Sequence, residues 1–176
     1  NQVNMENAMK RFPIGVQTFD KIIEDDCLYI DKTRYVHEIA EKYQYVFLSR
    51  PRRFGKSLLS STFHCYFEGK KDLFKGLKAG EMKREWKKHP VLHFDMSRAK
   101  HKDEAQLLRM LDYMLEEYEE VYGKNPAVDK VDVNARLDYL VRKSVEETGE
   151  KAVLIIDEDD APLLDVINDK TKIEPL

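Results

Sequence analysis

The chain has 176 residues, of which 42% are hydrophobic and 36% are charged. This length and composition suit one folded domain with a real core and a charged surface, and they exclude a disordered chain. The formal net charge of −3 gives no reason to expect broad, charge-driven binding to nucleic acid or to a membrane surface.

Neither a membrane span nor a secretory signal is expected. No run of about 18 apolar residues is present, and the polar residues 1–10 lack the apolar region of a signal peptide. The two cysteines, Cys27 and Cys65, form no CxxC pair, so we expect a cytoplasmic protein with two free thiols. Cys65 is expected to be a small buried hydrophobic residue rather than a nucleophile. The five histidines show no spacing typical of a zinc site.

The N-terminal part is predicted to form a short unit followed by a helix. Residues 12–31 form the unit, which contains a short strand at Cys27–Ile30. A helix is predicted over about 33–42 from the spacing of its apolar residues. Residues 12–42 are thus interpreted as an extension that precedes a core over residues 43–176, all within a single domain.

A strand, a tight loop and a helix follow one another at the start of this core. The segment Tyr43–Ser49 is nearly continuously apolar from Tyr45 to Leu48, which is typical of a strand buried on both faces of a sheet. A loop leads into a helix predicted over Lys56–Glu68, and Gly69 is a natural stop.

The middle of the chain is predicted to contain a second strand and a long helix. Residues 70–89 are basic and are expected to be irregular or short-helical. Pro90–Ser97 is predicted to be a strand. Its proline stands at the first residue, where a missing N–H least disturbs the hydrogen bonds between strands. Residues 103–122 carry apolar side chains at helical spacing and are predicted to form an amphipathic helix.

A last helix and a last strand complete the alternating pattern. Asp132 is predicted to cap a helix that ends at Gly149. Its inward residues are expected to be Leu137, Leu140, Val141 and Val145. Ala152–Ile156 is an unbroken apolar run, typical of a central parallel strand. The alternation predicts an α/β fold with a mostly parallel sheet, in which ligands bind at the carboxyl ends of the strands.

The loop Arg50–Ser57 reads RPRRFGKS and differs from the Walker A pattern GxxxxGK[ST] only at its first glycine, which is replaced by Arg50. Such a loop turns backbone N–H groups toward phosphate oxygens at the start of a helix. Gly55 supplies the permissive backbone, Lys56 the cation that reaches the β- and γ-phosphates, and Ser57 the hydroxyl for Mg²⁺. The expected nucleotide-binding residues are Arg50, Pro51, Arg52, Arg53, Phe54, Gly55, Lys56, Ser57 and Leu58.

Two plainer interpretations of this loop stay open. Arg52 and Arg53 either lie beside the phosphates or are solvated loop residues. The Gly-Lys-Ser string on its own is common at helix starts that bind no ligand, but here the strand, the loop length and a second motif agree with it.

The second motif is the acidic end of the last strand. Val153–Asp157 resembles a Walker B strand, whose terminal aspartate holds Mg²⁺. Glu158 is expected to be the general base that polarises the attacking water, since ATPases with an additional strand between the Walker strands use a glutamate there. The alternative is an ordinary strand end followed by carboxylates at a helix start, which we favour for Asp159 and Asp160. A carboxylate-cluster nuclease is a weaker interpretation.

At these residues the chain resembles the predicted AAA-ATPase-like proteins of bacteria. The resemblance is most specific at the RPRRFGKS string, and it implies that Arg50 is this family's own version of the loop. The family usually has tyrosine after the Asp-Glu pair, where this chain has Asp159. The matching segments are Phe12–Phe19, Leu28–Thr33, Phe47–Leu58, Phe67–Gly69, Pro90–Ser97 and Ile156–Leu163.

The resemblance implies a P-loop NTPase of the additional-strand, AAA-like class, with a three-layer αβα sheet that is incomplete at the C-terminus. Its implied cofactors are ATP and Mg²⁺, its implied catalytic residues are Lys56 and Glu158, and its implied magnesium ligands are Ser57 and Asp157. Family members are usually longer and often continue into a nuclease-like domain, and AAA-like proteins often form rings. A nuclease-like domain and a homo-oligomer are therefore the implied partners.

Three functions remain open from the sequence. The first is ATP binding with Mg²⁺-dependent hydrolysis in the full-length protein. The second is an ATP-gated regulatory module with little turnover. The third is a DNA-directed accessory domain, suggested by the family's nuclease association and by the basic stretch Lys70–Lys88.

Overall fold

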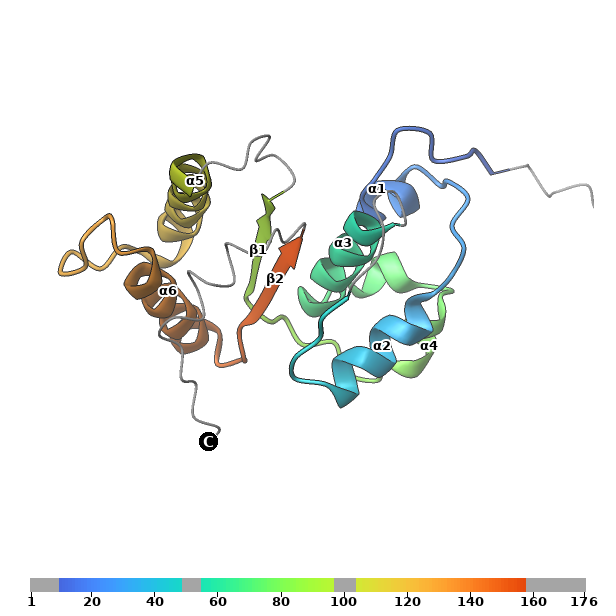
Figure 1. The fold of residues 1–176 in the computed structure, drawn as a ribbon. Coiled ribbons are helices and arrows are strands. Elements are labelled where there is room, and N and C mark those ends of the chain that lie inside the picture. The colour runs from blue at the N-terminus through green and yellow to red at the C-terminus, as the bar shows by residue number, and fades with distance from the viewer. Residues whose placement is uncertain (1–9, 49–54, 97–103, 158–176) are drawn as a thin grey trace, which may run out of the picture. The chain divides into compact units, whose positions relative to one another are not determined.

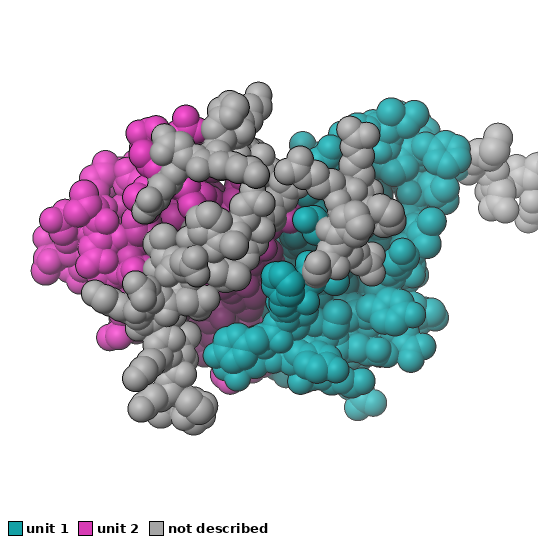
Figure 2. All heavy atoms as spheres, viewed as in Figure 1, with its two compact units in different colours: residues 1–86 teal, residues 87–176 magenta. Residues whose placement is uncertain are grey.

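The computed structural model describes residues 10–48, 55–96 and 104–157. The chain divides into two compact units, residues 1–86 and 87–176, which Figure 2 colours separately. Each unit is described below by itself. The prediction of a single domain with an extension over 12–42 stays a prediction.

The described part of the first unit is helical (Figure 1). The predicted helices over 33–42 and from Lys56 onward are confirmed. The helix α1 was not predicted, because six residues are too few to show a period. The stretch predicted to be irregular or short-helical contains two short helices. The elements are α1 (Phe19–Glu24), α2 (Thr33–Lys42), α3 (Lys56–Phe67), the 3₁₀ helix η1 (Lys71–Phe74) and α4 (Lys78–Met82).

Aromatic rings form much of the core of this unit. The ring of Phe74 lies 4.8 Å from that of Phe19, 5.9 Å from that of Tyr66 and 5.0 Å from that of Trp86, measured between centroids. Such pairs add about 0.5–1.5 kcal/mol each beyond the area they bury. Cys65 is 3% exposed and packs in the same cluster, which confirms its predicted role as a small buried residue. The buried members are Phe19, Val36, Cys65, Tyr66, Phe74 and Ala79.

The side chain of Asp31 accepts hydrogen bonds at the starts of both α2 and α4. Its Oδ1 accepts hydrogen bonds from the backbone N–H and the hydroxyl of Thr33, at 2.8 and 2.6 Å. Its Oδ2 accepts a bond from the N–H of Lys78 at 2.8 Å, and the hydroxyl of Thr33 accepts one from Ala79 N–H at 3.0 Å. Both α2 and α4 therefore have first-turn N–H groups satisfied by side chains.

Two predicted strands of this unit are wrong. The described residues of the first, 43–48, form no strand, and their side chains are exposed, with Phe47 at 78%. An apolar run becomes a buried strand only when a neighbour satisfies its backbone groups, and no described strand pairs with it. At Cys27–Ile30 the structure has only an isolated bridge between Arg11 and Cys27.

The second unit contains a two-stranded parallel sheet and two long helices that lie on the same side of it (Figure 1). The predictions of both helices and both strands are confirmed. Asp132 caps α6 by accepting a hydrogen bond from the N–H of Ala135 at 3.0 Å. The elements are β1 (Val91–Asp95), α5 (Glu104–Tyr122), α6 (Val133–Thr148) and β2 (Val153–Asp157).

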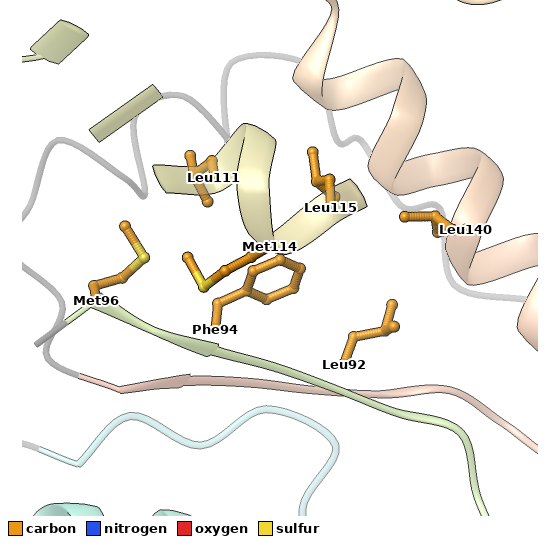
Figure 3. Close-up of a cluster of buried hydrophobic side chains, with 7 residues drawn as sticks. All are labelled: Leu92, Phe94, Met96, Leu111, Met114, Leu115 and Leu140. Carbon is orange, nitrogen blue, oxygen red and sulfur yellow. The ribbon is translucent and has the colours of Figure 1, made fainter. Parts of the chain in front are cut away.

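Alternate side chains of the sheet face these helices and form the core of the second unit. Figure 3 shows Leu92, Phe94 and Met96 directed toward the residues that α5 and α6 contribute. Val145 was predicted to face inward, but it is 37% exposed, because it lies near the end of α6. The buried cluster consists of Leu92, Phe94, Met96, Leu111, Met114, Leu115 and Leu140.

The hydroxyl of Tyr118 on α5 bonds to the backbone of β1. It accepts a hydrogen bond from the N–H of His93 at 2.6 Å and donates one to the carbonyl of the same residue at 3.1 Å. Because Val153 N–H bonds to Pro90 O, the odd-numbered residues of β1 direct their backbone groups away from β2. Tyr118 therefore satisfies both outward backbone groups of His93. The described residues thus form a mixed helix and strand structure with a small parallel sheet, as expected of an α/β fold.

Candidate functional site

Among the described residues, no side chain caps the start of the helix α3. Gly55 stands at its N-cap position in the left-handed region, with φ 74° and ψ 27°. The first N–H groups of an α-helix have no partner within the helix. A left-handed residue directly before a helix turns successive N–H groups toward one point, which favours an anion. This helix start is therefore suited to bind phosphate.

Lys56 and Ser57 occupy the first two positions of α3. Both are half-buried, and neither side chain makes a hydrogen bond or an ion pair to another described residue. The hydroxyls that follow are used within the helix, since Ser60 donates to the carbonyl of Lys56 at 2.9 Å. Lys56 and Ser57 are thus the polar groups left for a ligand at this helix start. The remaining predicted loop residues, Arg50–Phe54, lie outside the described residues.

A carboxylate is buried at the end of the second strand. Asp157 is the last residue of β2 and is 5% exposed. Its side chain makes no hydrogen bond or ion pair to the other residues that the structure describes. A buried carboxylate that stays ionised needs a cation or hydrogen-bond donors to offset its desolvation. Glu158, the predicted general base, lies outside the described ranges.

Asp95 stands beside Asp157, and sequence reasoning missed it. The two residues are paired in the parallel register of β1 and β2, so their side chains are on the same face of the sheet. The sequence did show an aspartate near the carboxyl end of the predicted strand Pro90–Ser97 and another directly after Ala152–Ile156. That observation alone does not reveal the register or that the two strands are neighbours.

These carboxylates fit the ligand chemistry of Mg²⁺. Within the described ranges, no group of three or more histidine, cysteine, aspartate or glutamate side chains is placed to hold a metal ion. Mg²⁺ is usually bound by one or two carboxylates together with substrate phosphates and water, rather than by a cage of protein ligands. Asp157 and its neighbour supply such a partial set of oxygen ligands.

The basic stretch Lys70–Lys88 already uses several of its cations within the protein. Lys70 lies 2.7 Å from a carboxylate oxygen of Glu68, and the ammonium of Lys83 lies 3.7 Å from the ring centroid of Tyr66. The DNA interpretation stays a prediction. None of the helices in the described ranges has the length and hydrophobicity needed to cross a bilayer.

Comparison with known proteins identifies the family. The chain is similar to a protein of Azotobacter chroococcum mcd 1 described as "Uncharacterized protein in vnfD 5'region", with 38% identity over 160 residues. This match covers 90% of the chain but 30% of that relative's length, and no solved structure matches. The sequence profile described as "Predicted AAA-ATPase" matches residues 13–175. The chain therefore belongs to the predicted AAA-ATPase family, as the RPRRFGKS string indicated.

Proposed function

We propose that this chain binds ATP with Mg²⁺ as the phosphate-binding part of a P-loop ATPase that hydrolyses ATP when full length. The observation that carries the proposal is the left-handed start of α3 at Gly55, followed by Lys56 and Ser57. Family membership supports nucleotide binding. The three-layer P-loop fold of the additional-strand class is part of this proposal.

Each residue has a defined role in the proposed reaction. The N–H groups at the start of α3 bind the phosphates, and Lys56 neutralises charge that develops on them. Ser57 and Asp157 would each serve as a ligand of Mg²⁺, which would supply positive charge to offset that of the phosphates. Glu158 orients the attacking water and accepts its proton. Phosphoryl transfer depends mainly on such positioning and charge stabilisation. Residues Arg50–Phe54 and Leu58 complete the loop around the phosphates.

The test separates binding from hydrolysis. Binding of a fluorescent ATP analogue and release of phosphate are measured for wild type, Lys56→Ala and Glu158→Gln. Lys42→Ala is the matched control, because Lys42 is an exposed lysine at the end of α2. Loss of a charge-assisted contact at Lys56 should weaken binding about 10- to 100-fold, whereas Glu158→Gln should keep binding and lose phosphate release. Circular dichroism checks that each variant is folded.

The outcomes decide between the two leading functions. Phosphate release by wild type that disappears in Glu158→Gln supports an ATPase. Binding that depends on Lys56, without phosphate release by this chain or by a longer form of the protein, supports an ATP-gated regulatory module instead. If neither wild type nor a longer form of the protein binds the analogue, the proposal fails.

A further inference from the structure

We propose that Asp95 and Asp157 together form a divalent-cation site at the carboxyl end of the β1–β2 pair, with Asp95 as its second carboxylate. Asp157 belongs to the proposed nucleotide site, so the cation's link to ATP rests on the proposed function. The assignment of Asp95 goes beyond it and depends on the geometry of the second unit.

The first argument is the register of the sheet. The two aspartates are paired directly across the parallel ladder, where neighbouring strands lie about 4.8 Å apart. Leu92 and Phe94 face the helices α5 and α6, and so does Ile156 from β2. Since side chains alternate along a strand, Asp95 and Asp157 both project from the opposite face.

The second argument is the burial of Asp157. The residue is 5% exposed, and its side chain has no hydrogen bond or ion pair within the described part of the chain. A bound cation offsets the cost of this burial, because it pairs with the buried residue's carboxylate.

The third argument concerns the kind of cation. Carboxylate oxygens are hard ligands that suit Mg²⁺ and Mn²⁺. The face of the sheet with the two aspartates also carries Val91 and His93 on β1 and Val153 and Ile155 on β2. The two carboxylates stand at the carboxyl end of this face. Two carboxylates leave coordination positions for water and for phosphate oxygens, as Mg²⁺ sites in nucleotide-binding proteins do.

The experiment uses Mn²⁺ as a substitute for Mg²⁺ in the full chain. Free Mn²⁺ is measured by electron paramagnetic resonance, with and without a non-hydrolysable ATP analogue, for wild type, Asp95→Asn and Asp157→Asn. Each substitution should weaken Mn²⁺ binding by about tenfold or more. The control is Asp138→Asn, which removes an exposed carboxylate of α6 in the same unit and should leave Mn²⁺ binding unchanged.

Thermal melting distinguishes a ligand from a structural residue. Added Mn²⁺ should raise the melting temperature of wild type more than that of Asp95→Asn, with each rise measured from the same protein without metal. If Asp95 were only structural, Asp95→Asn would keep the full Mn²⁺-induced rise, which would overturn the assignment.

The outcomes also separate this inference from the proposed function. Mn²⁺ binding that depends on Asp157 but not on Asp95, in a protein that binds the ATP analogue, overturns the inference alone. Mn²⁺ binding that needs both aspartates in a protein that binds no analogue overturns the proposed function alone. Wild type that binds no Mn²⁺ under either condition overturns the cation site.

Discussion

The guanidinium of Arg136 holds both carboxylate oxygens of Glu119, with Nε–Oε1 at 2.6 Å and Nη2–Oε2 at 3.1 Å. Nη1 of Arg136 also bonds to Asp112 at 2.6 Å and to the carbonyl of Lys130 at 2.9 Å. Arg136 is 4% exposed and Glu119 7%. One bidentate, buried ion pair thus joins α5, α6 and the loop between them.

We expect Arg136→Met to destabilise the chain by about 3–5 kcal/mol, because the buried carboxylate of Glu119 loses its bidentate partner and keeps only Lys124, at 3.5 Å. The control Arg142→Met removes an exposed pair with Asp138 and should cost less than about 1 kcal/mol. Urea unfolding gives both values. Adding Glu119→Leu to Arg136→Met should recover much of the loss, since no unpaired charge remains. Equal costs for the two arginine variants would contradict this account.

The same pair predicts a loss of stability in acid. Hydrogen bonds from Arg136 hold the pKa of Glu119 below its ordinary value of 4.5, although burial alone would raise it. Because the pKa is lower in the folded state, the unfolded chain binds more protons as the pH falls. The contribution of Glu119 to the unfolding free energy is therefore fully present above about pH 4.5 and is lost as the pH falls through the folded pKa.

The measurement is the unfolding free energy across a series of pH values for wild type and for the Arg136→Met, Glu119→Leu double variant. Most other carboxylates titrate alike in both proteins, so the difference between the two curves reports on Glu119 and on Asp112, which also bonds to Arg136. The double variant should lose less stability than wild type below about pH 4.5. Parallel curves would show that Glu119 titrates alike in the folded and unfolded states.

Removing the Asp31 side chain should destabilise the first unit. Asp31→Ala takes away the acceptor for N–H groups at the starts of both α2 and α4, and the loss of one cap costs about 1 kcal/mol. We therefore expect a loss of about 2 kcal/mol in unfolding free energy. The control Asp25→Ala changes an exposed aspartate in the loop after α1. An equal effect of the two substitutions would show that the caps contribute nothing.

A methyl group at Gly80 has no room. A Cβ atom at this position would overlap the carbonyl oxygen of Phe74, which is backbone and moves only with η1. Gly80→Ala should cost about 1–3 kcal/mol, as overpacking does, whereas Glu81→Ala at the next, exposed position should cost less than about 0.5 kcal/mol. Thermal melting compares the two, and an unchanged melting temperature for Gly80→Ala would show that the backbone yields at little cost.

The two cysteine thiols should be unreactive in the folded protein. Both side chains are buried, and burial raises the pKa of the Cys65 thiol to about 11. At neutral pH the thiolate, which is the reactive form, is therefore scarce. Ellman's reagent should label both thiols only after denaturation, while an added thiol in Lys42→Cys should react at once. Fast labelling of folded wild type would mean that the unit around Cys65 opens readily.

The predictions from the sequence were best for helices whose apolar residues recur at regular spacing. The helices α5 and α6 each bury an apolar stripe, and the bounds of α6 follow from a polar cap at Asp132 and a terminal Gly149. The strand expected around Tyr45–Leu48 failed because an apolar run does not specify its pairing partner. Asp95 was overlooked for the same reason, since its pairing with Asp157 is a matter of register. Part of the candidate site therefore depends on which strands pair and in which register, and a single sequence does not reveal this.

The hydrogen bonds between Tyr118 and His93 occupy the outer edge of β1, so a further strand of this sheet would pair with β2. A strand that approached β1 from outside would have to displace a hydroxyl that already satisfies both backbone groups at its middle residue. Among the described residues, no side chain forms such hydrogen bonds at the outer edge of β2. Any further strand would therefore pair with β2. The protected edge of β1 also disfavours edge-to-edge association of two molecules, as protected edge strands do in other sheets.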